Sequence, residues 1–175
     1  GYVHNPHRAN TEPLDMVVDS DTLKHWLADY DSDNITIGVV ASHSSLQILH
    51  GARMEGFKTL GIAVGENRRR FYKAFPGAEP DEWLMLEHYR EMLDHAEWFR
   101  ERNVVIIPHG SLVEYLGSSN FRSLQVPTFG NRGILHWESS RARQREWLES
   151  GGCTMPRVLE DPHDIDGPVI VKYAG

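Results

Sequence analysis

The sequence is poor in cysteine, because Cys153 is the only one among 175 residues. A single thiol forms neither an internal disulfide nor a cysteine-type zinc site, so both are excluded within this chain. The sequence also lacks an apolar run of the roughly 20 residues that a membrane helix requires, and its first residues lack the apolar segment of a signal peptide. These absences predict a cytoplasmic protein that does not contact a membrane.

Positive charge is also scarce, because 18 Lys and Arg residues stand against 25 Asp and Glu residues and leave a formal net charge of −7. Such a balance gives no electrostatic basis for binding a polyanion, so we expect no nucleic-acid partner. Apolar residues make up 40% of the chain and charged residues 25%, which is typical of a soluble globular protein. The length predicts one domain, or one domain with part of a second.

What is present is an alternation of short apolar runs with segments of helical periodicity. A helix is expected from Ser20, as its N-cap, to Tyr30. The run at 35–40 is short, β-branched and almost wholly apolar, like a strand that is covered on both faces. A helix that ends at Gly56 and a second strand at 59–64 follow. Together they predict a βαβ unit of a parallel sheet.

The rest of the chain is assigned in the same way. The segment 65–80 is expected to be an irregular connection, because it holds two prolines and three adjacent arginines. These arginines could reach a phosphate, but we interpret them as part of a solvated loop. The other expected elements are strands at 83–86, 104–107, 126–129, 156–159 and 169–172, and helices at 89–99, 111–116 and 134–149. Asn131 is expected to cap the last of these helices.

One helical stripe carries side chains that could ligate a metal. His88, Glu91 and His95 share one side of the helix expected at 89–99. Exposed histidine and glutamate are common among the charges of a solvated helix face. We therefore predict that this chain holds no metal ion.

Two short Ser/His loops carry the functional argument. Ser42-His43-Ser44-Ser45 follows the first strand, and His109-Gly110-Ser111 follows the strand at 104–107. If these strands are parallel neighbours, the loops meet at the carboxyl edge of the sheet, where such folds bind ligands. Free backbone N–H groups at a helix start bind phosphate, and an imidazole can hydrogen-bond a ligand or move a proton. The pattern predicts a site for a phosphate-bearing ligand.

A simpler interpretation of these serines stays open. Ser is among the commonest N-cap residues, so Ser44 and Ser111 could merely cap the helices that follow them. The histidines would then be loop residues packed for stability. The same pattern in two places favours the ligand site over this capping interpretation.

Four stretches resemble, in order and spacing, the N-terminal part of a known enzyme family. The stretches are 42–46 with 51–57, then 108–111, then 129–132 with 137–139, and last 164–167 with 169–172. The family is that of the archaeal formate-dependent purine ligases, PurP, and the resemblance covers about residues 20 to 175. Four motifs in order are far more specific than any one of them.

The resemblance implies a fold and a chemistry. Members of this family are ATP-grasp ligases that form formyl phosphate from formate and ATP, and the 5-amino group of the nucleotide AICAR attacks it to give formyl-AICAR, ADP and phosphate. The implied fold is α/β, a Rossmann-like pre-ATP-grasp domain with a parallel sheet flanked by helices, followed by the start of an ATP-grasp domain. The implied partners are AICAR, formate and ATP, and the pathway is purine (IMP) biosynthesis. Homo-oligomerisation stays open.

By position, His43 and Ser111 match family residues that contact AICAR, and Lys172 matches a lysine that reaches ATP phosphates. Together with the loop argument, the expected substrate-binding residues are His43, Ser44, Ser45, His109, Gly110, Ser111 and Arg132. ATP and Mg²⁺ are the cofactors implied for the full-length protein, but the family's Mg²⁺-binding acids follow Lys172 and are absent here. Phosphoryl transfer needs metal ions and positive groups around the phosphate, so we expect this chain alone to be inactive.

The expected organisation has three parts: an N-terminal arm at 1–18, a nucleotide-binding domain at 19–152, and a linker with the first strands of a truncated ATP-grasp domain at 153–175. Two alternatives to the N-terminal part of a formate-dependent ligase remain. The chain could be a free-standing nucleotide-binding or regulatory module without catalysis, or part of an ATP-grasp ligase for a different amine. The unpaired apolar strand expected at 169–172 favours part of a larger enzyme.

Overall fold

The computed structural model describes residues 18–138, 140–159 and 161–171, and the chain divides into two compact units, Gly1–Gly130 and Asn131–Gly175. The expected arm at 1–18, apart from Val18, and Lys172 lie outside the described residues. None of the helices in the described part of the chain is long and apolar enough to cross a membrane.

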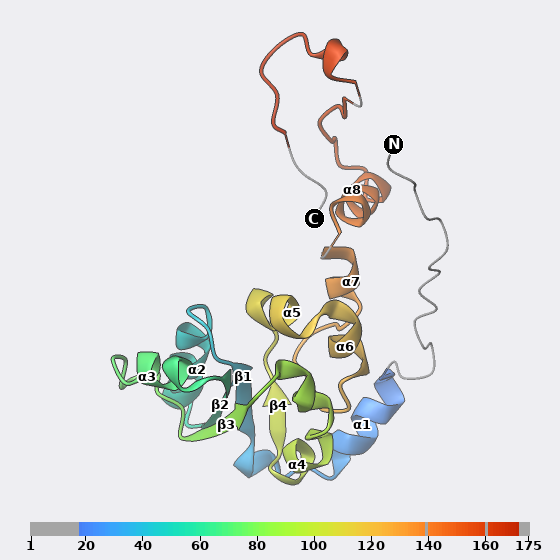
Figure 1. Cartoon of the computed structure of the whole chain (residues 1–175). Helices are drawn as coiled ribbons and strands as arrows, with labels where there is room; N and C mark the ends of the chain where they lie inside the picture. The colour runs from blue at the N-terminus through green and yellow to red at the C-terminus, as the bar shows by residue number, and fades with distance from the viewer. Residues whose placement is uncertain (1–17, 139, 160, 172–175) are drawn as a thin grey trace. The chain divides into compact units, whose positions relative to one another are not determined.

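The first unit is an α/β domain in which strands alternate with helical segments (Figure 1). Its elements in chain order are α1 (Ser20–Ala28), η2 (Ser32–Asn34), β1 (Thr36–Val40), α2 (Ser45–Met54), β2 (Lys58–Val64), α3 (Glu66–Tyr72), β3 (Glu82–Leu86), η3 (Tyr89–Leu93), α4 (Ala96–Glu101), β4 (Val104–Ile106), α5 (Gly110–Leu116) and α6 (Ser118–Ser123). The predicted α/β class, with a parallel sheet flanked by helices, is confirmed.

The four strands form one parallel sheet in the order β3-β2-β1-β4. In the centre of the sheet, Ile37 of β1 lies between Thr59 of β2 and Val105 of β4. The chain therefore moves outward from β1 through β2 to β3 and then crosses back to place β4 on the other side of β1. The segment expected as a strand at 126–129 contributes a single parallel bridge, from Thr128 to Ile106.

Both faces of the sheet are covered, which explains why β1 and β2 are apolar throughout. On one face, alternate strand residues pack with side chains of α2, α3 and the segment after α3, in a cluster of Val39, Ala41, Leu49, Ala63, Tyr72 and Ala78. The intervening Val40 and Ile62 are also fully buried and point to the opposite face. Figure 1 shows α2 and α3 on one side of the strands and α4 on the other.

Several helix predictions need correction. The segment 65–80 is not wholly irregular, because α3 starts directly after Gly65, whose φ of 80° turns the chain, and arginine is a good helix former. The single helix expected at 89–99 is instead η3 followed by α4. Between them, His95 Nδ1 lies 2.8 Å from the Glu91 carbonyl oxygen. At α1 the N-cap is Asp19, whose carboxylate accepts from the Thr22 N–H at 2.7 Å, and not Ser20.

The second unit contains α7 (Ile134–Glu138), α8 (Arg141–Ser150) and η4 (Pro162–Asp164). The single helix expected at 134–149 is thus two helices, because the Ser140 hydroxyl accepts from the Arg143 N–H and starts α8. The expected capping residue Asn131 accepts from the Gly133 N–H at 2.8 Å. The strands expected at 156–159 and 169–172 are wrong as far as they are described: residues 156–159 and 169–171 carry no regular structure, and a strand is stable only with neighbours to pair with.

Candidate functional site

The two Ser/His loops lie beside each other at the carboxyl edge of the sheet, because β1 and β4 pair in parallel. The His109 Nε2 atom lies 2.9 Å from the carbonyl oxygen of Val40, the last residue of β1. A carbonyl oxygen only accepts hydrogen bonds, so Nε2 carries the proton and donates it. This bond ties the second loop to the strand that leads into the first. The loops therefore have the geometry that the site hypothesis requires.

A buried hydrogen-bond network holds the first loop. The Tyr72 hydroxyl donates to the Ser42 carbonyl oxygen at 2.6 Å and lies 2.8 Å from Ser45 Oγ. The Ser42 N–H donates to Ser45 Oγ at 2.7 Å. Burial raises the pKa of the Tyr72 hydroxyl, so it stays protonated and able to donate. Ser45, expected to contact substrate, is fully buried, and its hydroxyl belongs to this network.

The two residues between Ser42 and Ser45 are exposed, namely His43 and Ser44. Ser44 occupies the N-cap position of α2, but its side chain accepts no capping hydrogen bond. The Ser44 N–H instead donates to Ser42 Oγ at 3.2 Å. The capping interpretation of Ser44 is therefore wrong, and its hydroxyl is available at the surface.

The second loop differs from expectation in the same way. The N-cap of α5 is His109, and the helix begins at Gly110, so Ser111 lies inside the first turn. Ser111 is buried, with 6% of its surface exposed. Its hydroxyl bonds no other side chain or backbone group among the described residues, so it is not a cap. Nothing lies within 4 Å of where a Cβ on Gly110 would stand, so there is open space beside the first residue of α5.

His109 has an unusual electrostatic environment. Among the described residues its Nδ1 atom is buried without a hydrogen-bond partner. Burial lowers the pKa of the His109 imidazole below its ordinary value of 6.5, the Val40 carbonyl opposes this, and the nearby His43 adds to it. His109 is therefore neutral at pH 7, with an acceptor lone pair on Nδ1. A buried unsatisfied atom of this kind often marks a functional site.

The burial of His109 predicts a pH-dependent stability. Its folded-state pKa lies below the unfolded value, so its contribution is complete above the unfolded value of 6.5 and is lost as the pH falls toward the folded value. Between about pH 7 and 5, the free energy of unfolding from urea titrations should fall less steeply in His109→Gln than in the wild type. The exposed His50→Gln serves as the control. Identical slopes for wild type and His109→Gln would contradict the assigned burial.

Three residues that sequence reasoning did not assign to the site also lie at the carboxyl ends of strands. Arg68 Nη2 donates to the Tyr115 hydroxyl at 2.9 Å. The Tyr115 ring stacks on that of Tyr89, with centroids 5.0 Å apart and an angle of 16° between the rings. The available signal was spacing: Arg68 and Tyr72 are four residues apart on α3, as are Ser111 and Tyr115 on α5, so each pair shares a helix face.

Arg132 falls in the second unit. Arg132 is buried, with 9% of its surface exposed, and this burial lowers the pKa of its guanidinium to about 10. Lys172 lies outside the described residues. Among the described residues, no group of three His, Cys, Asp or Glu side chains is placed to hold a metal ion.

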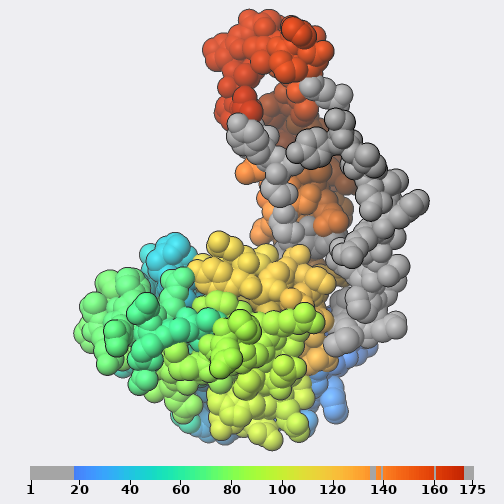
Figure 2. Space-filling view, in the orientation of Figure 1, coloured from blue at the N-terminus to red at the C-terminus, as the bar shows by residue number. Residues whose placement is uncertain are grey.

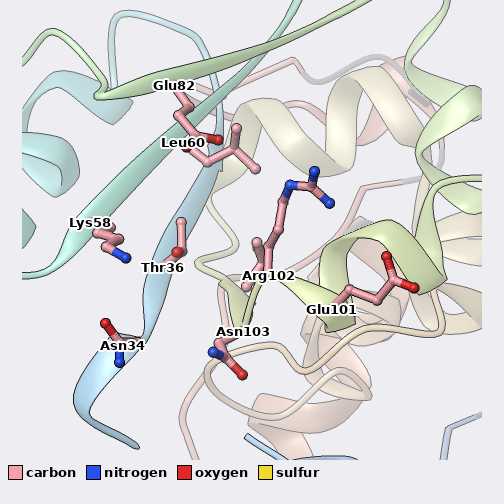
Figure 3. Close-up of a pocket in the computed structure, with 9 residues that line it drawn as sticks. Asn34, Thr36, Lys58, Leu60, Glu82, Glu101, Arg102 and Asn103 are labelled. Carbon is pink, nitrogen blue, oxygen red and sulfur yellow. The ribbon is translucent and has the colours of Figure 1, made fainter. Parts of the chain in front are cut away.

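A hollow of about 210 Å³ lies at the opposite, amino edge of the sheet (Figure 3). It is lined by Asn34, Thr36, Lys58, Leu60, Glu82, Glu101, Arg102, Asn103 and Val104. Its two basic side chains, Lys58 and Arg102, are balanced by two acidic ones, Glu82 and Glu101. The hollow therefore favours no charge on a ligand, and it is separate from the two loops.

The sheet and its two loops define an α/β domain of the class that binds ligands at the carboxyl edge of parallel strands. The chain belongs to a family whose model matches residues 37–159 and is described as "Protein of unknown function (DUF1246)".

Named relatives are longer than this chain. One from Methanosarcina mazei, "5-formaminoimidazole-4-carboxamide-1-(beta)-D-ribofuranosyl 5'-monophosphate synthetase 1", is 57% identical over 150 residues, which cover 86% of this chain and 42% of the relative. A synthetase of the same name, without the final numeral, from Methanothrix thermoacetophila is 52% identical over 159 residues, 91% of this chain and 44% of the relative. The chain thus spans less than half the length of these relatives. The resemblance to formyl-AICAR synthetases seen in the four motifs is confirmed.

One solved structure shares a weaker likeness. It is the "Crystal structure of phosphoribosylaminoimidazole carboxylase ATPase subunit from Aquifex aeolicus", with 17% identity, a TM-score of 0.44, and coverage of 72% of this chain and 36% of that one. A likeness of this size carries no argument about this chain.

Proposed function

We propose that this chain is the nucleotide-binding N-terminal part of an ATP-dependent ligase that formylates AICAR with formate in IMP biosynthesis. The observation that carries the proposal is the meeting of the two Ser/His loops at one edge of the sheet. Each loop offers polar groups that the fold does not use, namely the Ser44 and Ser111 hydroxyls and the buried His109 Nδ1. The names of the relatives support the substrate, because they describe synthetases of a formylated ribonucleotide.

The proposed substrate fits the chemistry of these groups. AICAR carries N–H and O–H donors, and a donor placed against His109 Nδ1 would satisfy that buried acceptor. Ser111 and Gly110, at the open start of α5, can contact an anionic oxygen through a hydroxyl and a backbone N–H. His43 is exposed beside them. When the amine attacks formyl phosphate, a C–N bond forms, the C–O bond to phosphate breaks, and the amine must release a proton, which an imidazole can accept.

The ATP-dependent half of the reaction belongs to the longer protein. We propose that Lys172 begins an ATP-grasp domain after a linker that starts near 153, and that Arg132 contributes to substrate binding. ATP and Mg²⁺ are the proposed cofactors of the full-length cytoplasmic enzyme, and AICAR, formate and ATP its proposed partners. Bound Mg²⁺ would neutralise the charge of the transferring phosphate.

The proposal is tested by calorimetric titration of this chain with AICAR. His43→Ala and Ser111→Ala should each weaken binding by roughly 1–3 kcal/mol, because each removes a polar partner from a desolvated ligand group. The matched controls are His50→Ala on α2 and Ser119→Ala on α6, which are both exposed and outside the two loops. Losses near zero at both His43 and Ser111, with folding intact, would contradict the proposed site.

A further inference from the structure

Arg68 is a restrained cation at the edge of the sheet. Its guanidinium donates to the Tyr115 hydroxyl at 2.9 Å, and its Cζ atom lies 5.7 Å from the centre of the Tyr115 ring. Tyr115 is in turn stacked on Tyr89. A guanidinium held in this way loses little conformational freedom when it binds a ligand.

Arg68 is also without a counter-charge in the part of the chain that the structure describes. Two other arginines of this unit do form ion pairs, Arg69 with Glu66 at 3.9 Å and Arg53 with Asp81 at 3.3 Å. No described carboxylate forms such a pair with Arg68, which is partly buried. Burial raises the pKa values of the Tyr72 and Tyr89 hydroxyls, and the positive charge of Arg68 lowers them in part. The charge of Arg68 therefore acts on the groups around the first loop.

The topology places Arg68 on a helix that lies next to the first loop of the candidate site. Helix α3 follows β2 and helix α5 follows β4, while β1 lies between these two strands. The loop after β1 is consequently flanked by both helices. On α3, Tyr72 bonds this loop and Arg68, four residues earlier, reaches Tyr115. On α5, Ser111 and Tyr115 share one face. Figure 2 shows the surface of α5 (yellow) meeting that of η3 (yellow-green), which supplies Tyr89.

We propose that Arg68 binds the phosphate group of the nucleotide, with the stacked Tyr115 and Tyr89 holding its guanidinium in position. Arginine presents several N–H donors in a planar fork that matches phosphate oxygens, and only one of its nitrogens is engaged with Tyr115. The Ser111 hydroxyl lies one helical turn from Tyr115 and can contact the same phosphate. This inference rests on the proposed function, because it takes the ligand of the two loops to be a nucleoside monophosphate.

The test compares two ligands that differ only in the phosphate, AICAR and its dephosphorylated nucleoside, by calorimetry on this chain. Arg68→Ala should weaken AICAR binding about 10- to 100-fold, the loss expected for one charge-assisted hydrogen-bonded partner, and leave nucleoside binding unchanged. Arg68→Lys keeps the charge without the planar fork and should fall between. Tyr115→Phe keeps the ring stack but removes the hydroxyl, so it should weaken AICAR binding several-fold and spare the nucleoside.

Arg69→Ala is the matched control, since Arg69 is the adjacent arginine and is already paired with Glu66. It should leave the affinity for both ligands at the wild-type value. Equal losses for AICAR and nucleoside in Arg68→Ala, or no loss for either, would overturn the assignment of Arg68 to the phosphate. Failure of the wild-type chain to bind AICAR at all would instead contradict the proposed function. We expect equal thermal unfolding midpoints for Arg68→Lys and the wild type. A change in AICAR affinity in this variant is then not caused by a change in folding.

Discussion

Gly61→Val is expected to lower the free energy of unfolding by about 3 kcal/mol, at the upper end of the range for overpacking a core. Gly61 lies in the middle of β2, paired with Trp83 of β3. A Cβ atom at this position would stand 2.6 Å from Pro80 Cγ and 2.8 Å from two atoms of the Trp83 ring. Both neighbours are rings that cannot swing away, so the strands must separate or shift. Urea denaturation followed by circular dichroism measures the loss.

A second glycine provides a control with the opposite sign. Gly51 lies inside α2, and nothing stands within 4 Å of where its Cβ would be. Gly51→Ala should therefore raise the free energy of unfolding by about 0.5–1 kcal/mol, because alanine costs less conformational entropy in a helix. Wild-type stability in Gly61→Val would show that β2 and β3 do not pack as described.

Tyr72→Phe is expected to cost about 1–3 kcal/mol of stability and also to weaken AICAR binding. The hydroxyl that it removes donates to the Ser42 carbonyl oxygen and accepts from the Ser42 N–H at 3.1 Å. The Tyr72 and Trp83 rings are in edge-to-face contact, with centroids 5.2 Å apart. The phenylalanine ring would keep this contact. The loss therefore isolates the hydroxyl network that holds the loop bearing His43. Urea denaturation gives the stability and calorimetry with AICAR gives the affinity.

Tyr30→Phe is the matched control for this variant. The Tyr30 hydroxyl also donates to a backbone carbonyl, that of Val104 at 2.9 Å, but at the amino end of β4. Its removal should lower stability by about 0.5–1.5 kcal/mol and leave AICAR affinity unchanged. If both variants altered affinity equally, the link between Tyr72 and the loop geometry would be refuted.

The sequence predicted the four strands well, because burial on both faces leaves a local signature in runs such as 36–40 and 58–64. It also located the Ser/His loops. It gave no sign of the buried network around the first loop, since the partner of Ser42 and Ser45 is Tyr72, 30 and 27 residues further on. The contact of Arg68 with Tyr115 spans 47 residues. No local pattern reports such pairs, because they exist only once the strand order is known.

The order β3-β2-β1-β4 also fixes where such a fold can bind a ligand. Right-handed crossovers carry α2 to one face of the sheet and the η3–α4 connection to the other, since the chain leaves β1 and reaches β4 in opposite directions. The carboxyl edge at the paired strands β1 and β4 is thus a topological switch point, where the segments that follow the strands diverge and where folds of this kind bind ligands. Substitutions in the two loops can change which molecule binds at this edge, but not the position of the switch point, which the connectivity of the strands determines.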